Sequence, residues 1–364
     1  MPRDTEHKDT APAMRIAVIG CGAATRLYAA PALARLERRG LARVTHLFDP
    51  ASEAIEAVRP LLAAAQPAPS LEAALDGADL ALIASPPALH ATQCTLALER
   101  GLHVFCEKPL ALTAAEADAV IAAAEATTEA GGRLLAVGLI RRHLPATRAI
   151  KALLDASALG PLRAVSWFEG GPFDWPVASA GYFSHAQSGG GVLQDIGTHA
   201  LDLLAWWLGP PMLVDYADDA MGGVEANARL RLRCGGAEVE MRLSRDWARP
   251  NRVTLHGERG MIGWTVNEPL TLDLDLDGAR PGRVTLGDEG GDESAGDFVS
   301  AYAAQVADVI DAIHSGRAPA VPVAAGREAC ALIEACYRAR RHLDMPWFSS
   351  ADRTRAAALA SGAP

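Results

Sequence analysis

The chain lacks the features that mark secreted, membrane-spanning and nucleic-acid-binding proteins. Its six cysteines are scattered without a C-x-x-C pair, which favours reduced thiols in a cytoplasmic protein over a disulfide framework. No apolar run approaches the roughly 20 residues that cross a bilayer, and the polar opening MPRDTEHKDTAPA lacks the apolar segment of a signal peptide. The net charge of −10 argues against a surface for nucleic acid or anionic membrane.

Lysine is the scarcest charged residue. Of the 34 Lys and Arg residues only three are lysine: Lys8, Lys108 and Lys151. Lys8 stands in the polar opening and Lys151 in an amphipathic helical pattern, so we interpret both as incidental. Lys108 directly follows the apolar run HVFCE, where a compact, titratable ammonium can do what a guanidinium cannot. Chance would also leave a few lysines, so scarcity alone makes Lys108 only a candidate.

Two kinds of hydrophobic pattern divide the chain. Between Met14 and about Ile140, short apolar runs alternate with helical patterns, which is typical of a doubly wound parallel sheet. After Ile140, four segments alternate strictly between apolar and polar residues, which predicts a large, mostly antiparallel sheet with one open face. The apolar runs are residues 14–20, 44–49, 80–85, 103–107 and 134–139, and the alternating segments are 228–234, 237–246, 252–258 and 270–277.

The stretch GCGAAT, residues 20–25, joins the first apolar run to the first helical pattern. In that context Gly20 permits a tight turn, and Gly22 lets a pyrophosphate approach the helix start at Ala23 and Ala24. The third glycine of the usual fingerprint is replaced by threonine, so we expect the helix to sit slightly further from the strand. The pattern predicts dinucleotide binding.

Two more strand ends carry candidate cofactor ligands. Asp49 ends the second strand, where a carboxylate accepts hydrogen bonds from the adenosine ribose. Because no arginine stands nearby to meet a 2′-phosphate, NAD(H) is favoured over NADP(H). Ser85, Pro86 and His90 lie in SPPALH, at the end of another strand, where ligands of such sheets bind. We interpret His90 as a structural or cofactor-site residue rather than a catalyst.

The helical stretch GGGVLQDIGTHALDLLAWWLG, residues 189–209, carries Asp195 and His199 four residues apart. On a helix this spacing puts both side chains on one face. Two readings stay open at this point, a satisfied core histidine or an active-site pair. A zinc site needs a third protein ligand, and only His185 stands close by, so no metal is predicted.

These motifs occur in the order and spacing of one known family. Gly-x-Gly, Asp49, SPP..H, CEKP and GGG.L.D.G.H are similar to the glucose-fructose oxidoreductase/inositol dehydrogenase (Gfo/Idh/MocA) family from Met14 to about His342. The resemblance implies a Rossmann domain, a second α/β domain with a large open sheet, and a catalytic cleft between them. It also implies hydride transfer between nicotinamide and a secondary alcohol or ketone of a sugar, amino sugar or cyclitol.

The resemblance assigns roles to individual residues. Glu107-Lys108-Pro109 matches the family's EKP motif, in which the lysine lies beside the nicotinamide and the reacting hydroxyl and the Lys–Pro bond is cis. His199 has an ordinary pKa of about 6.5 and can accept or donate the hydroxyl proton near neutrality. Lys108 can stabilise the alkoxide or carry the proton itself, so the choice between the two stays open. Asp195 would hold a neighbouring hydroxyl and orient the imidazole.

Three further residues are candidates for substrate binding. Trp175 and Tyr182 stand in an aromatic loop just before the helix, where core packing and the lining of a sugar-sized cleft are equally good interpretations. Arg141 could meet a substrate carboxylate or phosphate, although a solvated linker charge is the commoner case. Two alternative functions also stay open: an enzyme that recycles a tightly bound NAD, and a non-catalytic dinucleotide sensor.

The predicted fold is therefore α/β, with a Rossmann domain and a second α/β domain. We expect a disordered tail over residues 1–13, an NAD(P)-binding domain over 14–140, a substrate-binding and oligomerisation domain over 141–346, and a loose tail over 347–364. Since an uncovered sheet face would form an apolar patch, we expect a homodimer or homotetramer that buries it.

Overall fold

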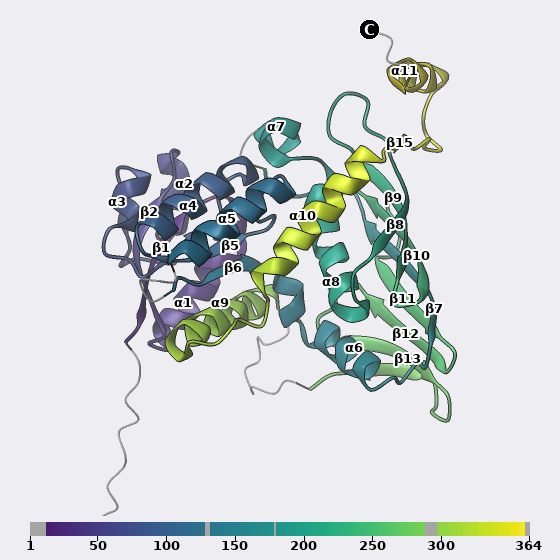
Figure 1. Cartoon of the computed structure of the whole chain (residues 1–364), viewed down its shortest axis with the longest axis horizontal. Coiled ribbons are helices and arrows are strands. Elements are labelled where there is room, and N and C mark those ends of the chain that lie inside the picture. The colour runs from purple at the N-terminus through teal and green to yellow at the C-terminus, as the bar shows by residue number, and fades with distance from the viewer. Residues whose placement is uncertain (1–11, 128–131, 178–179, 288–296, 361–364) are drawn as a thin grey trace, which may run out of the picture.

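The structure, a computed structural model, describes residues 12–127, 132–177, 180–287 and 297–360. Two β-sheets form the two halves of the molecule, and helices lie between and around them (Figure 1). Residues 1–11 of the expected N-terminal tail, and residues 178–179 of the aromatic loop, lie outside the described residues.

The first sheet is the predicted doubly wound parallel sheet, with strand order β3-β2-β1-β4-β5-β6. Its interior strands carry continuous apolar runs because helices cover both faces. The sequence missed only the two-residue edge strand β3. The strands are β1 (Met14–Ile19), β2 (Ala42–Phe48), β3 (Gln66–Pro67), β4 (Leu80–Ile83), β5 (His103–Glu107) and β6 (Leu135–Gly138). The helices that follow them are α1 (Ala30–Arg38), α2 (Ser52–Val58), α3 (Leu71–Leu75), α4 (His90–Glu99) and α5 (Ala114–Ala126).

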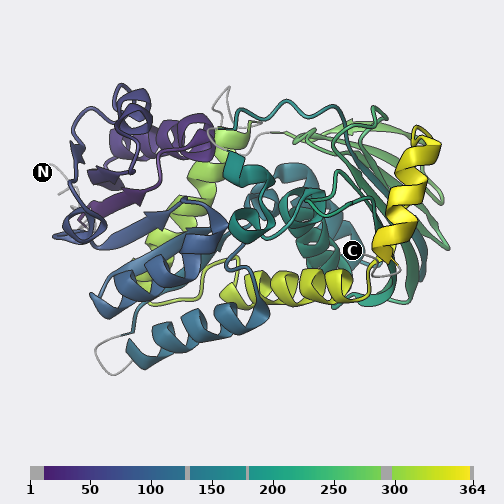
Figure 2. The same ribbon diagram turned by 90° about the horizontal axis from the view of Figure 1, so that it is seen from above.

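One late helix returns to this first sheet. Helix α9 (Phe298–Ser315) begins at Asp297, whose carboxylate accepts a hydrogen bond from the Ser300 amide. It packs against α1, and its residues Tyr302, Val306 and Ile310 join the core of the first sheet. Figure 2 shows this light green helix lying among the purple and blue elements of the first half of the molecule. The chain therefore enters the second half of the molecule and then crosses back.

The second sheet has nine strands in the order β14-β13-β12-β11-β7-β10-β9-β8-β15. It is mostly antiparallel, as predicted, but β7 and β10 run parallel, as do β8 and β15. Helices α6 (Pro145–Asp155), α8 (Thr198–Leu208) and α10 (Val323–Arg338) supply residues to the core on its inner face (Figure 1). The strands are β7 (Leu162–Gly170), β8 (Met212–Asp218), β9 (Asn227–Cys234), β10 (Ala237–Ser244), β11 (Arg252–Gly257), β12 (Gly260–Thr265), β13 (Thr271–Leu276), β14 (Gly282–Thr285) and β15 (Arg341–His342).

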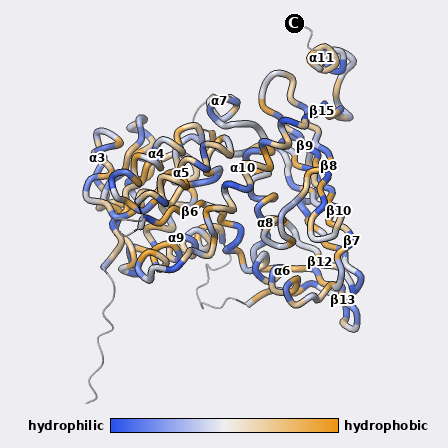
Figure 3. The backbone as a smooth tube through the Cα atoms, in the orientation of Figure 1, coloured by the Kyte–Doolittle hydropathy of each residue, from blue (hydrophilic) through white to orange (hydrophobic). Residues whose placement is uncertain are grey.

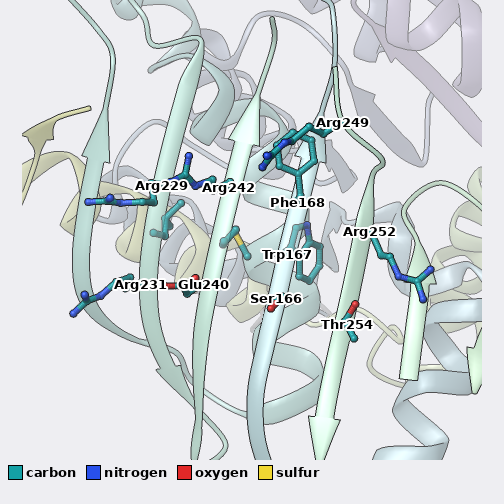
Figure 4. A pocket seen from close by; sticks show the side chains of 12 residues that line it. Ser166, Trp167, Phe168, Arg229, Arg231, Glu240, Arg242, Arg249, Arg252 and Thr254 are labelled. Carbon is teal, nitrogen blue, oxygen red and sulfur yellow. The ribbon is translucent and has the colours of Figure 1, made fainter. Parts of the chain in front are cut away.

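The outer face of this sheet is charged, which corrects the reason given above for assembly. Strict alternation turns the apolar side chains of β9 and β10 towards the helices, so polar side chains remain outside. Hydrophilic residues recur along these strands (Figure 3), and five of the twelve residues that line a pocket on this face are arginines (Figure 4). The polar lining residues are Ser166, Arg229, Arg231, Glu240, Arg242, Arg249, Arg252 and Thr254. The premise of an apolar patch is therefore wrong, and the oligomeric state stays a prediction.

The end of the chain is ordered differently from the sequence expectation. Where a loose tail was expected after Pro346, residues Ser350–Ala360 form helix α11, and Arg353 pairs with Asp344 at 2.9 Å. In the described part of the chain, no helix is long and apolar enough to span a membrane.

Candidate active site

The carboxyl ends of four neighbouring strands, β2, β1, β4 and β5, bring the predicted cofactor residues to one edge of the first sheet. Gly20 follows β1 with a φ of +94°, and a Cβ there would lie 2.6 Å from the backbone of Ala84 and Ser85. Only glycine fits this position. A Cβ on Gly22 would meet no atom within 4 Å, so the space in front of it is open.

The helix after this turn begins with a π-helical turn, η1 (Thr25–Ala29). The side chain of Thr25, which replaces the third glycine, is fully buried, and its hydroxyl donates a 2.6 Å hydrogen bond to the carbonyl oxygen of Gly20. Thr25 thus stabilises the turn by a side-chain hydrogen bond, whereas the third glycine of the usual fingerprint allows close packing of the helix on the strand. The first amides of such a helix lack intrahelical partners, which leaves donors at Ala23 and Ala24 for an anion.

Asp49 lies next to the glycine turn. One carboxylate oxygen accepts a 2.8 Å hydrogen bond from the Cys21 amide, and the other accepts a 2.9 Å bond from the Ala51 amide. The carboxylate therefore holds the glycine turn in place. Each carboxylate oxygen can accept more than one hydrogen bond, so Asp49 retains capacity for ribose hydroxyls.

His90 joins the two other loops at this edge. Its Nδ1 lies 2.7 Å from the carbonyl oxygen of Pro109 and its Nε2 lies 2.8 Å from that of Ser85. The side chain is 1% exposed, and burial lowers the pKa of the imidazole. Ser85 also donates a 2.6 Å hydrogen bond to Gln93. His90 thus connects the SPP loop to the EKP loop and is itself shielded from solvent.

The EKP segment ends β5, and the peptide bond between Lys108 and Pro109 is cis, as the resemblance implied. Glu107 accepts hydrogen bonds from the Tyr302 hydroxyl at 2.7 Å and from the Lys108 amide at 3.2 Å. Burial raises the pKa of Glu107, against the lowering effect of Tyr302 and Lys108. Helix α9, which carries Tyr302, therefore helps to fix the loop that presents the lysine.

Lys108 contacts Asp195 across the two halves of the molecule. Its Nζ lies 2.6 Å from the carboxylate of Asp195 and 3.2 Å from the Asp195 carbonyl oxygen. Burial alone would raise the pKa of Asp195, but the positive charges of Lys108 and Arg245 lower it well below its usual range. The side chain of Lys108 is 18% exposed and that of Asp195 34% exposed, so the pair remains open to a small ligand.

His199 lies on the same helix as Asp195. The helix starts with a second π-helical turn, η6 (Leu193–Gly197), and continues as α8, and such turns occur often at functional sites. Within the described residues, the buried Nδ1 of His199 has no hydrogen-bond partner. Burial lowers the pKa of His199 well below its usual value, and the charges of Lys108 and Arg141 add to this, against the opposite effect of Asp195. The imidazole is therefore neutral near pH 7, and a satisfied core histidine does not describe it.

Two residues surround the second oxygen of the Asp195 carboxylate. The Tyr182 hydroxyl donates to it at 2.6 Å, and the Arg245 guanidinium donates to it at 3.0 Å and to the Tyr182 oxygen at 2.8 Å. Arg245 is 8% exposed and lies over the rings of Tyr182 and Phe173. Sequence reasoning included Tyr182 but missed Arg245, because it directly follows a period-two strand and reads there as a solvated charge.

The glycine run before this helix packs against the protein itself. A Cβ on Gly191 would lie 1.9 Å from the Glu225 carbonyl oxygen, and one on Gly190 would lie 1.9 Å from the Tyr337 hydroxyl oxygen. The Glu225 carboxylate, 2% exposed, accepts hydrogen bonds from the amides of Gly191 at 3.0 Å and Leu193 at 2.9 Å, and from the Tyr337 hydroxyl at 2.9 Å. Sequence reasoning did not single out Glu225, which no motif marks.

The two remaining substrate candidates lie elsewhere. Arg141 forms a buried ion pair with Glu169, in which one contact measures 2.9 Å, and its charge acts on His199. Trp175 stacks on Tyr28 of the π-helical turn η1, with ring centroids 6.1 Å apart. The aromatic loop thus reaches across to the first half of the molecule. Arg141 is thus paired within the protein, and Trp175 lies beside the helix that follows the glycine turn.

Within the described residues, no group of three or more His, Cys, Asp or Glu side chains could hold a metal ion. The residues at the strand ends do fit a dinucleotide: an open space faces Gly22 at a helix start, with the Asp49 carboxylate beside it.

Sequence comparison identifies the two halves. A family model described as "Oxidoreductase family, NAD-binding Rossmann fold" (GFO_IDH_MocA) matches residues 14–133, and the GFO/IDH/MocA C-terminal domain matches residues 147–263. A dTDP-3,4-didehydro-2,6-dideoxy-alpha-D-glucose 3-reductase of Streptomyces violaceoruber is 31% identical over 243 residues, which cover 65% of this chain and 68% of that enzyme. A putative UDP-kanosamine synthase oxidoreductase subunit of Amycolatopsis mediterranei is 40% identical over 36% of this chain and 35% of its own length, so the chain matches about a third of that relative.

Solved structures share the fold. Levoglucosan dehydrogenase in complex with NADH and levoglucosan superposes with a TM-score of 0.79 at 20% identity, over 90% of this chain and 96% of that one. An oxidoreductase domain protein from Kribbella flavida gives a TM-score of 0.77 at 24% identity, over 90% and 97% of the two chains.

Proposed function

Because the chain belongs to the Gfo/Idh/MocA oxidoreductase family, we propose that it transfers a hydride between a nicotinamide cofactor and a secondary alcohol or ketone on a sugar, amino sugar or cyclitol. The observation that carries the proposal is the 2.6 Å pair between Lys108 and Asp195, with the neutral His199 on the same helix as Asp195. The dTDP-sugar 3-reductase reported above is, by its name, an enzyme that acts on a sugar, which supports the substrate class.

The cofactor would be held at the edge of the first sheet. Gly20, Gly22, Ala23 and Ala24 would bind its pyrophosphate, and Asp49 would bind the adenosine ribose. A carboxylate at the ribose also repels a 2′-phosphate, so NAD(H) is the proposed cofactor. Ser85, Pro86, His90 and Glu107 would shape the remainder of this edge, with His90 and Glu107 acting through the loops that they fix.

The bound nicotinamide would accept or return the hydride, and this chain's residues would move the proton. We assign proton transfer to Lys108, because its ammonium is both accessible and held beside the place for the substrate hydroxyl by Asp195. His199 is a weak base in this environment, since burial and two nearby cations lower its pKa. It would therefore bind the reacting oxygen as a neutral imidazole, and Asp195 and Tyr182 would bind neighbouring substrate hydroxyls.

A panel of sugars, amino sugars and inositols, assayed for NADH formation at 340 nm, tests the proposal. Lys108→Ala and His199→Asn should each lower turnover by roughly 10²–10⁴-fold, which is the usual contribution of a positioned acid–base group. NADH affinity, followed by fluorescence, should change little for His199→Asn. A His199→Asn protein with a lowered melting temperature but normal turnover would show that this histidine has a structural role in the core and no role in catalysis. Absorbance at 340 nm in the purified protein that decays on addition of a ketone would instead indicate tightly bound, recycled NAD.

A further inference from the structure

Arg245 is a buried cation in direct contact with Asp195, and the chemistry described above does not use it. It is the first residue after β10, which ends at Ser244, and it is 8% exposed. Its NH2 group donates to the Asp195 carboxylate, the Tyr182 hydroxyl and, at 3.4 Å, the carbonyl oxygen of Gly191. Its Nε is buried without a hydrogen-bond partner in the part of the chain that the structure describes.

The two cations bind opposite oxygens of one carboxylate. Lys108 contacts Oδ1 of Asp195, and Arg245 contacts Oδ2 together with the Tyr182 hydroxyl. A carboxylate with lysine as its one cationic partner would hold the lysine as ammonium and oppose its deprotonation. A second cation that never releases its proton weakens the attraction between the carboxylate and the lysine ammonium. It also balances the negative charge of the carboxylate when the lysine becomes neutral.

We propose that Arg245 is a positioning residue that acts as the permanent counter-ion of Asp195 and so lets Lys108 lose and regain its proton. The inference rests on the proposed function and deepens it. In the oxidation direction, the neutral Lys108 amine takes the hydroxyl proton as the hydride leaves the carbinol carbon for the nicotinamide. In the reduction direction, the Lys108 ammonium returns that proton to the ketone oxygen, and Arg245 retains its own charge in both.

Other charged groups face this pair from the surrounding elements. Glu107 precedes the lysine on β5 and is engaged by Tyr302. His199 lies on α8, and Arg141, from the short helix η4 (Ile140–His143), is neutralised by Glu169. The Tyr182 hydroxyl stays protonated, because burial and then Asp195 raise its pKa. Arg245 is therefore the nearest fixed positive charge to Asp195 other than the lysine.

The scarcity of lysine makes a direct test possible. Trace acetylation with acetic anhydride over a pH series, read by mass spectrometry, gives the midpoint at which each lysine becomes reactive. Lys108 and Lys151 are the lysines among the described residues, and the pair of Lys151 with Asp155 serves as an internal reference. The full-length protein is used without cofactor, so the measurement requires no turnover.

Arg245→Gln should move the Lys108 midpoint up by about one pH unit, because removal of the second cation strengthens the hold of Asp195 on the ammonium. Lys151 should not shift. Arg245→Lys restores a charge at this position and should bring the midpoint most of the way back. Arg231→Gln, on the exposed outer face of β9, is the matched control and should leave both midpoints unchanged.

An unchanged or lower Lys108 midpoint in folded Arg245→Gln would overturn the inference. Thermal melting identifies a variant that fails to fold, and Arg245→Met, which keeps an unbranched side chain without the charge, then supplies the comparison: a raised Lys108 midpoint supports the counter-ion and an unchanged one contradicts it. If wild type turns over no sugar or cyclitol, the proposed function fails while labelling still tests Arg245. If turnover is found, kcat/KM for oxidation should need a higher pH in Arg245→Gln, by the same shift.

Discussion

Replacement of Glu225 tests how the loop before β9 holds the start of the helix that carries Asp195 and His199. Its buried carboxylate accepts hydrogen bonds from the Gly191 amide, the Leu193 amide and the Tyr337 hydroxyl. Each buried donor left without a partner costs about 1–3 kcal/mol. Glu225→Ala leaves three donors without a hydrogen-bond partner and creates a small cavity. We therefore expect the free energy of unfolding to fall by roughly 3–5 kcal/mol, in the range measured for broken buried networks.

The expected loss can be read as a melting temperature. In a chain of 364 residues, 1 kcal/mol corresponds to about 1.3 °C, so Glu225→Ala should melt roughly 4–7 °C below wild type. Tyr337→Phe removes only one donor, the hydroxyl group, and should lower the free energy of unfolding by about 1 kcal/mol. Glu240→Ala, on the exposed face of β10, is the control and should stay within about 1 °C of wild type.

Circular dichroism at increasing temperature makes the measurement without any substrate. A Glu225→Ala protein that melts like the Glu240→Ala control would show that the carboxylate does not hold the turn. The Gln variant adds a second check, because an amide in place of the carboxylate turns a donor towards the backbone amides. Glu225→Gln should therefore fall between wild type and Ala, and a Gln variant more stable than wild type would contradict the hydrogen-bond assignment.

Three further predictions follow from the same contacts. Lys108→Arg should restore little of the turnover that Lys108→Ala loses, because a guanidinium is larger and does not release its proton; near-wild-type turnover in the Arg variant would exclude Lys108 as proton carrier. Asp49→Asn keeps an acceptor for the Cys21 amide but removes the charge, so the ratio of kcat/KM for NAD to that for NADP should fall, and a wild type that already prefers NADP would contradict the role of Asp49. Burial lowers the pKa of His143 to about 4. Because its pKa is lower in the folded state, this histidine destabilises the fold as the pH falls from about 6.5 to about 4. The free energy of unfolding, measured by urea titration, should therefore fall by about 2 kcal/mol less between pH 7 and pH 5 in His143→Gln than in wild type.

Local patterns predicted the features that depend on neighbours in the chain. The continuous apolar runs gave the parallel sheet, since a strand covered on both faces is apolar at every position. GCGAAT and Asp49 could be read because a strand end, a tight turn and a helix start succeed one another within a few residues. The two-residue strands β3 and β15 escaped detection because they are too short to show a period, and β8, β12 and β14 were not predicted either.

Other features depend on contacts between distant residues. The alternation of apolar and polar residues already predicts a polar outer face for the second sheet. The expectation of a covering partner assumed an apolar patch there, which the alternation excludes. Arg141 had the charge of a substrate ligand but is neutralised by Glu169 on a strand 28 residues away in sequence. Trp175 had the character of a cleft residue but stacks on Tyr28 in the other half of the molecule.

The sequence by itself determined the residue types of the site, because the strand ends and the Asp195–His199 spacing are local. Only the tertiary structure decided their electrostatic state. Lys108, Asp195, Tyr182 and Arg245 come from four separate segments, and a charge acts strongly on another only within a few ångströms. No spacing along the chain encodes that distance, so only the packing of η6 against the end of β10 places the buried Arg245 cation beside Asp195.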